Sequence, residues 1–266
     1  MIKITIKNKY KNFERSKAYQ SLKNIEILRK LKSVVSQTHW RFFPAKYRLH
    51  DDPILRSAFK LVGKEIKVTS IIETGTFRGY STSLMAEQFP NTQVFTSEIN
   101  PTNFKKARNN LKDFKNVKVF KGTSPKFLEF LIKEKKLGEN PLFFLDAHWF
   151  DNWPLEDEIK IITNKINKAV ILIDDFKIPG DNRFAYDKYG NKDCSLELIK
   201  PKMKKKNKYH LLFPNYGEDV FKGKYHPVMS GYSIIFQNMQ KEFRELLKNP
   251  LIKKFFVNKS ELLKLS

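Results

Sequence analysis

The chain has 266 residues, of which 41% are hydrophobic and 30% charged, enough apolar side chains to bury the core of one large domain. Its formal net charge is +23, which suits a nucleic-acid partner, but only nine of the 51 basic residues are arginine and the lysines are spread along the sequence. An even spread is typical of a solvated lysine surface, so nucleic-acid binding stays an alternative that the sequence does not favour.

A single cysteine, Cys194, excludes an internal disulfide, and no apolar run is long enough to span a bilayer. The first ten residues, MIKITIKNKY, carry charge but no apolar signal core. We therefore expect a cytoplasmic protein in a reducing compartment, without a membrane span.

Residues 1–65 are predicted to form an N-terminal helical extension. Beyond it, short apolar runs rich in Val, Ile and Phe alternate with segments of helical period, without an internal repeat or a linker. The predicted strands cover 68–73, 93–99, 117–121, 142–146 and 169–174, and the predicted helices cover 81–88, 102–112, 125–136 and 154–167. This alternation predicts right-handed crossovers and an α/β fold, in which helices cover both faces of a mostly parallel sheet.

The alternation ends after the fifth predicted strand. A loop and a helix over 195–204 precede two further strands, 209–213 and 232–237, with glycines and no helical period between them. We predict that these two strands form an antiparallel pair at one edge of the sheet. The main domain is expected to cover 66–238, and 239–266 is expected to be a C-terminal helical extension packed on it.

The first predicted strand leads into a glycine-containing stretch, IIETGTFRGYST. Gly75 permits a tight turn, Gly79 lets the backbone approach a ligand, and the following helix offers free N–H groups to a polar group. Glu98 ends the second predicted strand, where a carboxylate can accept hydrogen bonds from both hydroxyls of a ribose. Since ligands of open parallel sheets bind at this carboxyl edge, the sequence predicts a nucleoside cofactor, either a nicotinamide dinucleotide or S-adenosylmethionine.

A family resemblance, carried by the residues along the rest of the chain, decides between these two cofactors. An acid-x-Gly-x-x-x-Gly loop (Glu73, Gly75, Gly79), the acid Glu98 and an antiparallel final strand pair make residues 66–238 resemble the class I S-adenosylmethionine-dependent methyltransferases. The resemblance implies a Rossmann-like, seven-stranded sheet of order 3-2-1-4-5-7-6 with an antiparallel last strand.

The resemblance also implies which residues hold the cofactor. The glycine loop would bind the methionine part, Glu98 the ribose, and the segment after the third strand the adenine. The cofactor residues that it implies are Glu73, Thr74, Gly75, Thr76, Gly79, Ser81, Glu98, Gly122, Thr123, Ser124 and Asp146. The sequence departs from the commoner Gly-x-Gly-x-Gly form because Phe77 stands at the middle position.

Three carboxylates follow two strands that are expected to be neighbours, about 4.8 Å apart. Asp146 ends the fourth predicted strand, and Asp174 and Asp175 end the fifth, at the edge that carries the cofactor loop. Clustered like charges repel unless a cation compensates, and Mg²⁺ is a hard divalent ion that takes oxygen ligands. The alternative is that one of these acids only caps a helix.

The same arrangement resembles the metal-dependent O-methyltransferases, particularly the macrocin O-methyltransferase-like branch that modifies sugars and, more distantly, the catechol O-methyltransferases. The resemblance implies that Asp146, Asp174 and Asp175 bind a divalent cation, which orients two acceptor oxygens and lowers the pKa of one of them. It implies methyl transfer to a hydroxyl of a sugar or another small polar acceptor.

The loops at this edge supply further candidates. His148 follows Asp146 by two residues and is the predicted general base, with Asp146 as the second catalytic residue. Trp149, Phe150 and Trp153 are candidates for stacking on a sugar face or for packing the next helix. Candidates for acceptor contacts in the loop after the fifth strand are Arg183, Tyr186, Asp187 and Tyr189. The histidines without metal spacing, expected to serve structure, are His39, His50, His210 and His226.

We therefore predict an S-adenosylmethionine-dependent O-methyltransferase, and three alternatives stay open at this point. An RNA methyltransferase is favoured by charge alone. A non-catalytic nucleoside-binding scaffold would not need the three aspartates, and a nicotinamide-dependent oxidoreductase would not need clustered carboxylates. The sequence also leaves open whether the protein forms a homo-oligomer.

Overall fold

The computed structural model describes residues 48–147, 153–221 and 229–264. Within this part of the chain, no helix is both long enough and apolar enough to cross a lipid bilayer. Some predicted features fall outside the described residues: His39, His148, Trp149, Phe150, His226 and the first 47 residues of the N-terminal extension.

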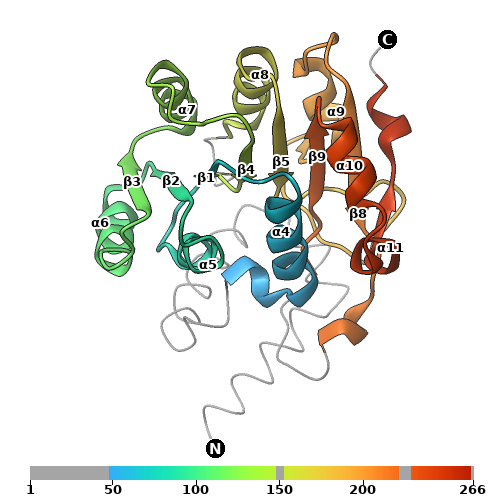
Figure 1. The fold of residues 1–266 in the computed structure, drawn as a ribbon, viewed down its shortest axis with the longest axis horizontal. Helices are drawn as coiled ribbons and strands as arrows, with labels where there is room; N and C mark the ends of the chain where they lie inside the picture. Colours follow the sequence, from blue (N-terminus) through green and yellow to red (C-terminus); the bar gives the residue numbers. More distant parts are fainter. Residues whose placement is uncertain (1–47, 148–152, 222–228, 265–266) are drawn as a thin grey trace, which may run out of the picture.

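A single large sheet runs through the middle of the described structure (Figure 1). Its strands are β1 (Ser70–Thr74), β2 (Gln93–Glu98), β3 (Val117–Lys121), β4 (Pro141–Leu145), β5 (Ala169–Ile173), β8 (Tyr209–Pro214), β9 (Ser233–Gln237) and β10 (Phe256–Asn258). Their order across the sheet is β3-β2-β1-β4-β5-β9-β8-β10, and β9 is antiparallel to both of its neighbours. With β8 and β9 counted as the sixth and seventh strands, the predicted order 3-2-1-4-5-7-6 is confirmed.

The eighth strand, β10, was not expected. The segment 239–266 forms two of the expected helices, α10 (Gln240–Leu246) and α11 (Pro250–Phe255), and then extends as β10 beside β8. The expectation of a wholly helical C-terminal extension is therefore wrong. Three residues are too few for a periodic pattern, and their pairing covers the edge of β8 that would otherwise expose its backbone groups.

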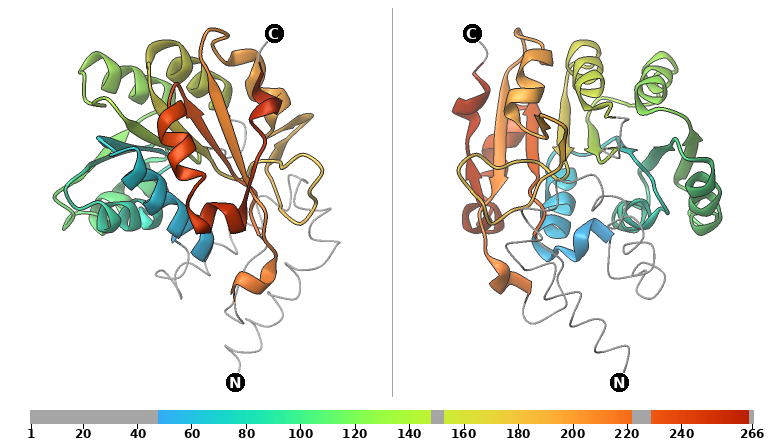
Figure 2. Two further views of the ribbon diagram at one scale, coloured as in Figure 1. Left: turned by 45° about the vertical axis from the view of Figure 1, so that its right-hand side comes forward. Right: turned by 180° about the vertical axis from the view of Figure 1, so that it is seen from behind.

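Helices pack on both faces of the sheet (Figures 1 and 2). The remaining helices are α4 (Pro53–Glu65), α5 (Tyr80–Gln88), α6 (Pro101–Asn110), α7 (Ser124–Lys133), α8 (Leu155–Lys165) and α9 (Leu196–Ile199). Helix α4 contacts α10 and α11, whereas α8 contacts α7 and α9. The helix predicted over 195–204 ends after one turn and continues as the 3-10 helix η3 (Lys200–Lys202), because Pro201 has no N–H to extend an α-helix.

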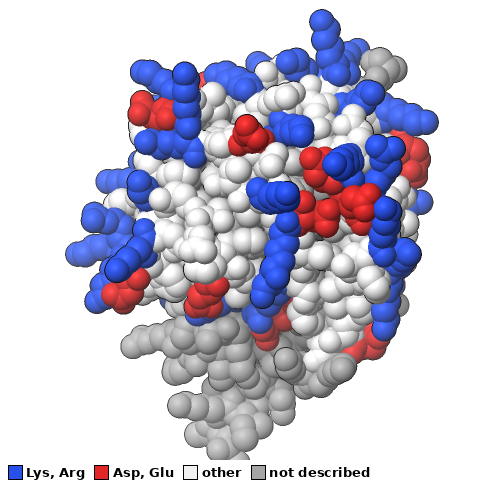
Figure 3. Space-filling view, viewed as in Figure 1, with Lys and Arg blue, Asp and Glu red and all other residues white. Residues whose placement is uncertain are grey.

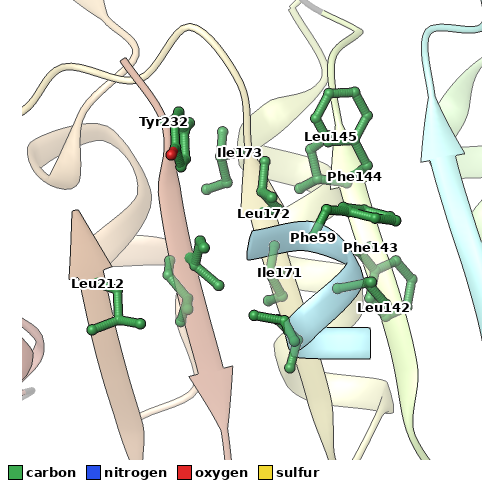
Figure 4. Close-up of a cluster of buried hydrophobic side chains, with 14 of the residues drawn as sticks. Phe59, Leu142, Phe143, Phe144, Leu145, Ile171, Leu172, Ile173, Leu212 and Tyr232 are labelled. Atoms are coloured by element: carbon green, nitrogen blue, oxygen red, sulfur yellow. The ribbon is translucent and has the colours of Figure 1, made fainter. Parts of the chain in front are cut away.

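The central strands are buried at every position, which explains their continuous apolar sequences. Figure 4 shows Phe59 of α4 among the side chains of β4 and β5. The same hydrophobic core extends from Leu49 to Leu263, so described parts of both predicted extensions share the core of the sheet. The domain boundaries at residues 66 and 238 stay predictions.

On the face that Figure 3 shows, the surface charge is spread rather than concentrated. On the face in Figure 3, Lys and Arg side chains are scattered over the helices, with Asp and Glu side chains between them. This distribution agrees with the interpretation of the charge as a solvated lysine surface.

Candidate functional site

The glycine loop after β1 brings the chain directly against the end of β4. Gly75 has φ +87°, and a Cβ at this position would lie 2.4 Å from the carbonyl oxygen of Asp146. The backbone N–H of Asp146 donates to the carbonyl of Thr74 at 3.0 Å, which fixes the two strand ends side by side. Gly79, with φ +82°, ends the loop and precedes the first turn of α5. The glycines are therefore required by close backbone packing as well as by turn geometry.

We expect Gly75→Ala to lower the free energy of unfolding by about 2 kcal/mol, because the new methyl group adds a clash to an unfavourable φ. Chemical denaturation would measure this. The matched control is Gly180→Ala, since Gly180 has φ +75° and open space around its Cβ position. It should lose only about 1 kcal/mol, and equal losses in both variants would contradict the proposed clash.

Phe77 occupies the position where the commoner motif has its middle glycine, and it does so in the left-handed region, with φ +50°. Its backbone N–H donates to Glu98 Oε2 at 2.7 Å. The departure from the motif is thus accommodated by a strained phenylalanine, and a hydrogen bond to the end of β2 stabilises this conformation.

Glu73 lies at the centre of a buried hydroxyl network. The hydroxyls of Thr82 and Thr96 both donate to Glu73 Oε2, and the hydroxyls of Thr76 and Thr96 are 2.6 Å apart. Burial raises the pKa of Glu73 to about 7, and the two threonine hydroxyls oppose this increase. Glu73 therefore ties the glycine loop to β2 and α5. Ser81, also in α5, accepts a hydrogen bond from the backbone N–H of Leu49.

Glu98 ends β2 as predicted, and backbone N–H groups bind both of its carboxylate oxygens. Oε2 accepts from Phe77 N, and Oε1 accepts from Asn100 N at 2.7 Å. Burial raises the pKa of Glu98, and the backbone N–H donors oppose this increase. The next residue, Ile99, has 49% of its surface exposed and is the more exposed of the two large apolar side chains that are exposed in the described part. Sequence reasoning missed Ile99, although an isoleucine directly after a predicted ribose ligand was a usable signal.

The segment after β3 closes against the same region. Gly122 N donates to the carbonyl of Glu98 at 3.0 Å, and Thr123 and Ser124 begin α7. Ser124 faces Glu158 of α8, a fully buried acid that sequence reasoning missed because it lies among ordinary surface-type residues of a helix. Burial raises the pKa of Glu158 to about 7, and the hydroxyls of Ser124 and Thr74 oppose this increase.

The predicted carboxylates meet at the ends of β4 and β5. Asp174 N donates to the carbonyl of Leu145 at 3.0 Å, which aligns Asp174 with the end of β4. Loss of hydration raises the pKa of Asp146 well above its ordinary value, and the charges of Asp174 and Asp175 raise it further. Asp187, from the loop after β5, adds a smaller effect of the same sign. Asp174 and Asp175, which follow β5, therefore lie near enough to Asp146 for their charges to act on it.

These acids do not form a finished metal site. Across residues 48–147, 153–221 and 229–264, no three His, Cys, Asp or Glu side chains are gathered closely enough to hold an ion. Asp174 nevertheless has a buried oxygen, Oδ1, without a hydrogen-bond partner among the described residues. An unpaired buried carboxylate oxygen beside further carboxylates fits the oxygen donors that a hard divalent cation takes.

The structure brings a different histidine to this edge. His50 Nε2 lies 2.6 Å from Asp174 Oδ2, although the sequence suggested only a structural role for His50. The predicted base His148 lies outside the described residues. Of the acceptor candidates, Tyr189 donates to Asp187 Oδ2 at 3.1 Å and stacks obliquely on Trp153, whereas Arg183 is paired with Asp181.

Comparison with known proteins agrees with this geometry. The family model described as O-methyltransferase matches residues 19–174, more than half of the chain, and this range includes Glu73, Glu98 and Asp146. No curated protein sequence matches. Comparison with solved structures matches this chain to several methyltransferases.

Two solved structures illustrate the likeness. The O-methyltransferase from Bacillus cereus in complex with S-adenosylhomocysteine has 19% identity over 78% of this chain and 90% of its own, with a TM-score of 0.52. TomG from Streptomyces achromogenes, an O-methyltransferase involved in tomaymycin synthesis, has 16% identity over 73% and 86%, with a TM-score of 0.48. At these identities the Bacillus cereus structure supports the fold. The family match establishes the activity class: the chain belongs to the O-methyltransferase family and is an S-adenosylmethionine-dependent O-methyltransferase.

Proposed function

We propose that this O-methyltransferase methylates a hydroxyl of a sugar or another small polar acceptor and that a divalent cation held by Asp146, Asp174 and Asp175 assists the reaction. The observation that supports this most is the pKa of Asp146, whose backbone packs against Gly75: burial raises this pKa, and the nearby charges of Asp174 and Asp175 raise it further. Cofactor and acceptor would then share one cavity edge, as transfer between them requires.

The cofactor would lie along the loop after β1. The glycine loop and Glu73 would contact its methionine part, and Glu98 would hold the ribose. Backbone N–H groups of Phe77 and Asn100 fix the orientation of the Glu98 carboxylate at the end of β2, where it would accept hydrogen bonds from the ribose. The exposed side chain of Ile99 would supply an apolar surface for the adenine.

The cation would supply polarisation of an acceptor hydroxyl and a lower hydroxyl pKa. The residues of the chain have separate tasks. Asp174 offers the unpartnered Oδ1, and Asp146 offers a carboxylate that its like-charged neighbours destabilise in the absence of a cation. Gly75 lets the backbone of the glycine loop pack directly against the backbone of Asp146. His148 stays the predicted base that accepts the hydroxyl proton.

The acceptor would lie against the loop after β5. The rings of Trp153 and Tyr189 are 4.9 Å apart, and Tyr189 is anchored by its hydrogen bond to Asp187. Asp187 in turn faces the carboxylates, because its charge contributes to the raised pKa of Asp146. An aromatic pair beside a carboxylate suits the apolar face and the hydroxyls of a sugar ring. The alternatives of an RNA methyltransferase, a binding scaffold and an oxidoreductase gain no support from the family match.

Calorimetric titration with S-adenosylhomocysteine tests the proposal. We expect binding that strengthens when Mg²⁺ is added, and we expect Asp174→Ala to bind the nucleoside but to lose the Mg²⁺ effect. The matched control is Asp157→Ala, an exposed acid on α8, which should behave as wild type. Absence of heat in all conditions would contradict cofactor binding, and a Mg²⁺ effect that survives Asp174→Ala would contradict the assigned ligand.

A further inference from the structure

Helix α8 carries a carboxyl group that the proposed reaction does not use. Glu158 lies in the first turn of α8, and none of its surface is exposed. A glutamate is almost never buried completely unless its charge is paired or its oxygens are hydrogen-bonded. Both carboxyl oxygens of Glu158 are buried without a hydrogen-bond partner in the described part of the chain. The position of this acid inside the protein therefore needs a physical reason.

Two hydroxyl groups face Glu158, and both belong to segments at the predicted cofactor edge. Thr74 ends β1 directly before the glycine loop, and Ser124 begins α7 after β3. Burial raises the pKa of Glu158, and the hydroxyls of both residues oppose this increase, so they lie within reach of its oxygens. Both hydroxyl oxygens are buried by the protein itself. The side chains of Thr74 and Ser124 are therefore turned inward, toward α8.

Four buried oxygens thus come together between β1, α7 and α8: Thr74 Oγ1, Ser124 Oγ and both carboxyl oxygens of Glu158. None of the four has a hydrogen-bond partner within the ranges that the structure describes. Buried polar atoms of proteins are nearly always hydrogen-bonded, and an internal water commonly supplies the partner where several of them converge. Two hydroxyls and one carboxyl group would give such a water about three partners.

We propose that Glu158 is a positioning residue for the cofactor: together with one internal water, its carboxyl group holds the end of β1 and the start of α7 in a fixed relative position. These two segments lie on either side of β2, whose last residue is Glu98. By the family resemblance, one segment leads to the methionine part of the cofactor and the other lies at the adenine. The link beneath them would set the spacing between the two ends of the pocket. This inference rests on the proposed place of the cofactor and adds a residue behind it.

Calorimetric titration with S-adenosylhomocysteine measures the effect without an acceptor or a cation. Glu158→Leu keeps a similar volume but removes both oxygens, so we expect the affinity to fall about tenfold or more. Glu158→Gln keeps an acceptor and gains a donor, so it should bind within about threefold of wild type. Thermal unfolding shows whether each variant is folded. Rescue by the amide would identify hydrogen bonding, rather than filling of the core, as the role of the side chain.

Thr74→Val tests the same link from its other end, because valine keeps the shape of threonine and lacks the hydroxyl. Its affinity for S-adenosylhomocysteine should also fall, and the double variant Thr74→Val/Glu158→Leu should lose little more than Glu158→Leu alone. The matched control is Thr163→Val on the same helix. Thr163 is fully buried too, but its hydroxyl oxygen accepts from the backbone N–H of Lys204. This control should lower the unfolding temperature and leave the affinity unchanged.

The outcomes separate the role of Glu158 from cofactor binding itself. Wild-type affinity in folded Glu158→Leu, or losses that multiply in the double variant, overturns the positioning role while the cofactor site stands. The role is also overturned if Thr163→Val weakens binding as much as Glu158→Leu does. If Glu158→Leu does not fold, wild-type affinity in Thr74→Val overturns it instead. Absence of binding in the wild-type protein overturns both the proposed place of the cofactor and the role of Glu158.

Discussion

Asp146→Asn is expected to stabilise the metal-free protein while weakening the proposed binding of a divalent cation. Asp146 has lost most of its hydration and faces Asp174 and Asp175, which raise its pKa further. A neutral amide removes this repulsion at neutral pH, so the free energy of unfolding should rise by about 1–2 kcal/mol. The same change removes a charged ligand of the proposed cation site, so calorimetry should show a loss of divalent-cation affinity of about tenfold to a hundredfold if the proposal holds.

This variant is informative because it should raise the free energy of unfolding and lower the cation affinity. A residue that serves only the fold loses stability on substitution, whereas a residue retained for function at the expense of stability gains it. The control is Asp181→Asn in the loop after β5, because a hydrogen bond from Arg183 lowers the pKa of Asp181. That variant should lose a fraction of a kcal/mol, as surface ion pairs do. A loss of stability in Asp146→Asn would contradict the like-charge interpretation.

The strand order could be predicted because its signals are local. Apolar runs of five or six residues, each followed by an acid or a glycine, mark β1, β2, β4 and β5, and the handedness of crossovers limits how these strands can be arranged. The same rules place Gly75, Glu98, Asp146 and Asp174 at one edge of the sheet. The shared edge of these residues could thus be predicted from the sequence without knowledge of any long-range contact.

The features that sequence reasoning missed depend on contacts between distant segments. His50 is 124 residues away from Asp174, and its approach depends on a left-handed turn that no glycine announces. Glu158 is buried only because α8 packs its first turns toward Thr74 and Ser124. The three residues of β10 form a strand because they pair with the edge of β8. In each case the residue type gave no signal in the sequence, because its role depends on contacts with residues far along the chain.

The stability of the protein should fall as the pH rises from about 4.5 to 7, and Glu73 should account for a large part of the decline. In the unfolded chain a glutamate loses its proton near pH 4.5, whereas burial raises the pKa of Glu73 to about 7 in the folded protein. Between these values the unfolded chain releases a proton that the folded protein keeps, so ionisation favours unfolding. The contribution of Glu73 is fully present below pH 4.5, declines through this interval and is lost above pH 7.

The interval corresponds to about 3 kcal/mol for one carboxyl group, a large share of the stability of a single domain. Denaturation of wild type and Glu73→Gln at several pH values measures it, and the variant should lose this part of the slope because an amide does not titrate. Glu158→Gln should remove a similar part, since burial raises the pKa of Glu158 to about 7 as well. Glu245→Gln, a surface control paired with Lys248, should leave the decline unchanged. A wild-type slope that persists in Glu73→Gln would mean that the threonine hydroxyls, rather than burial, dominate this carboxyl group and keep it ionised in the folded protein.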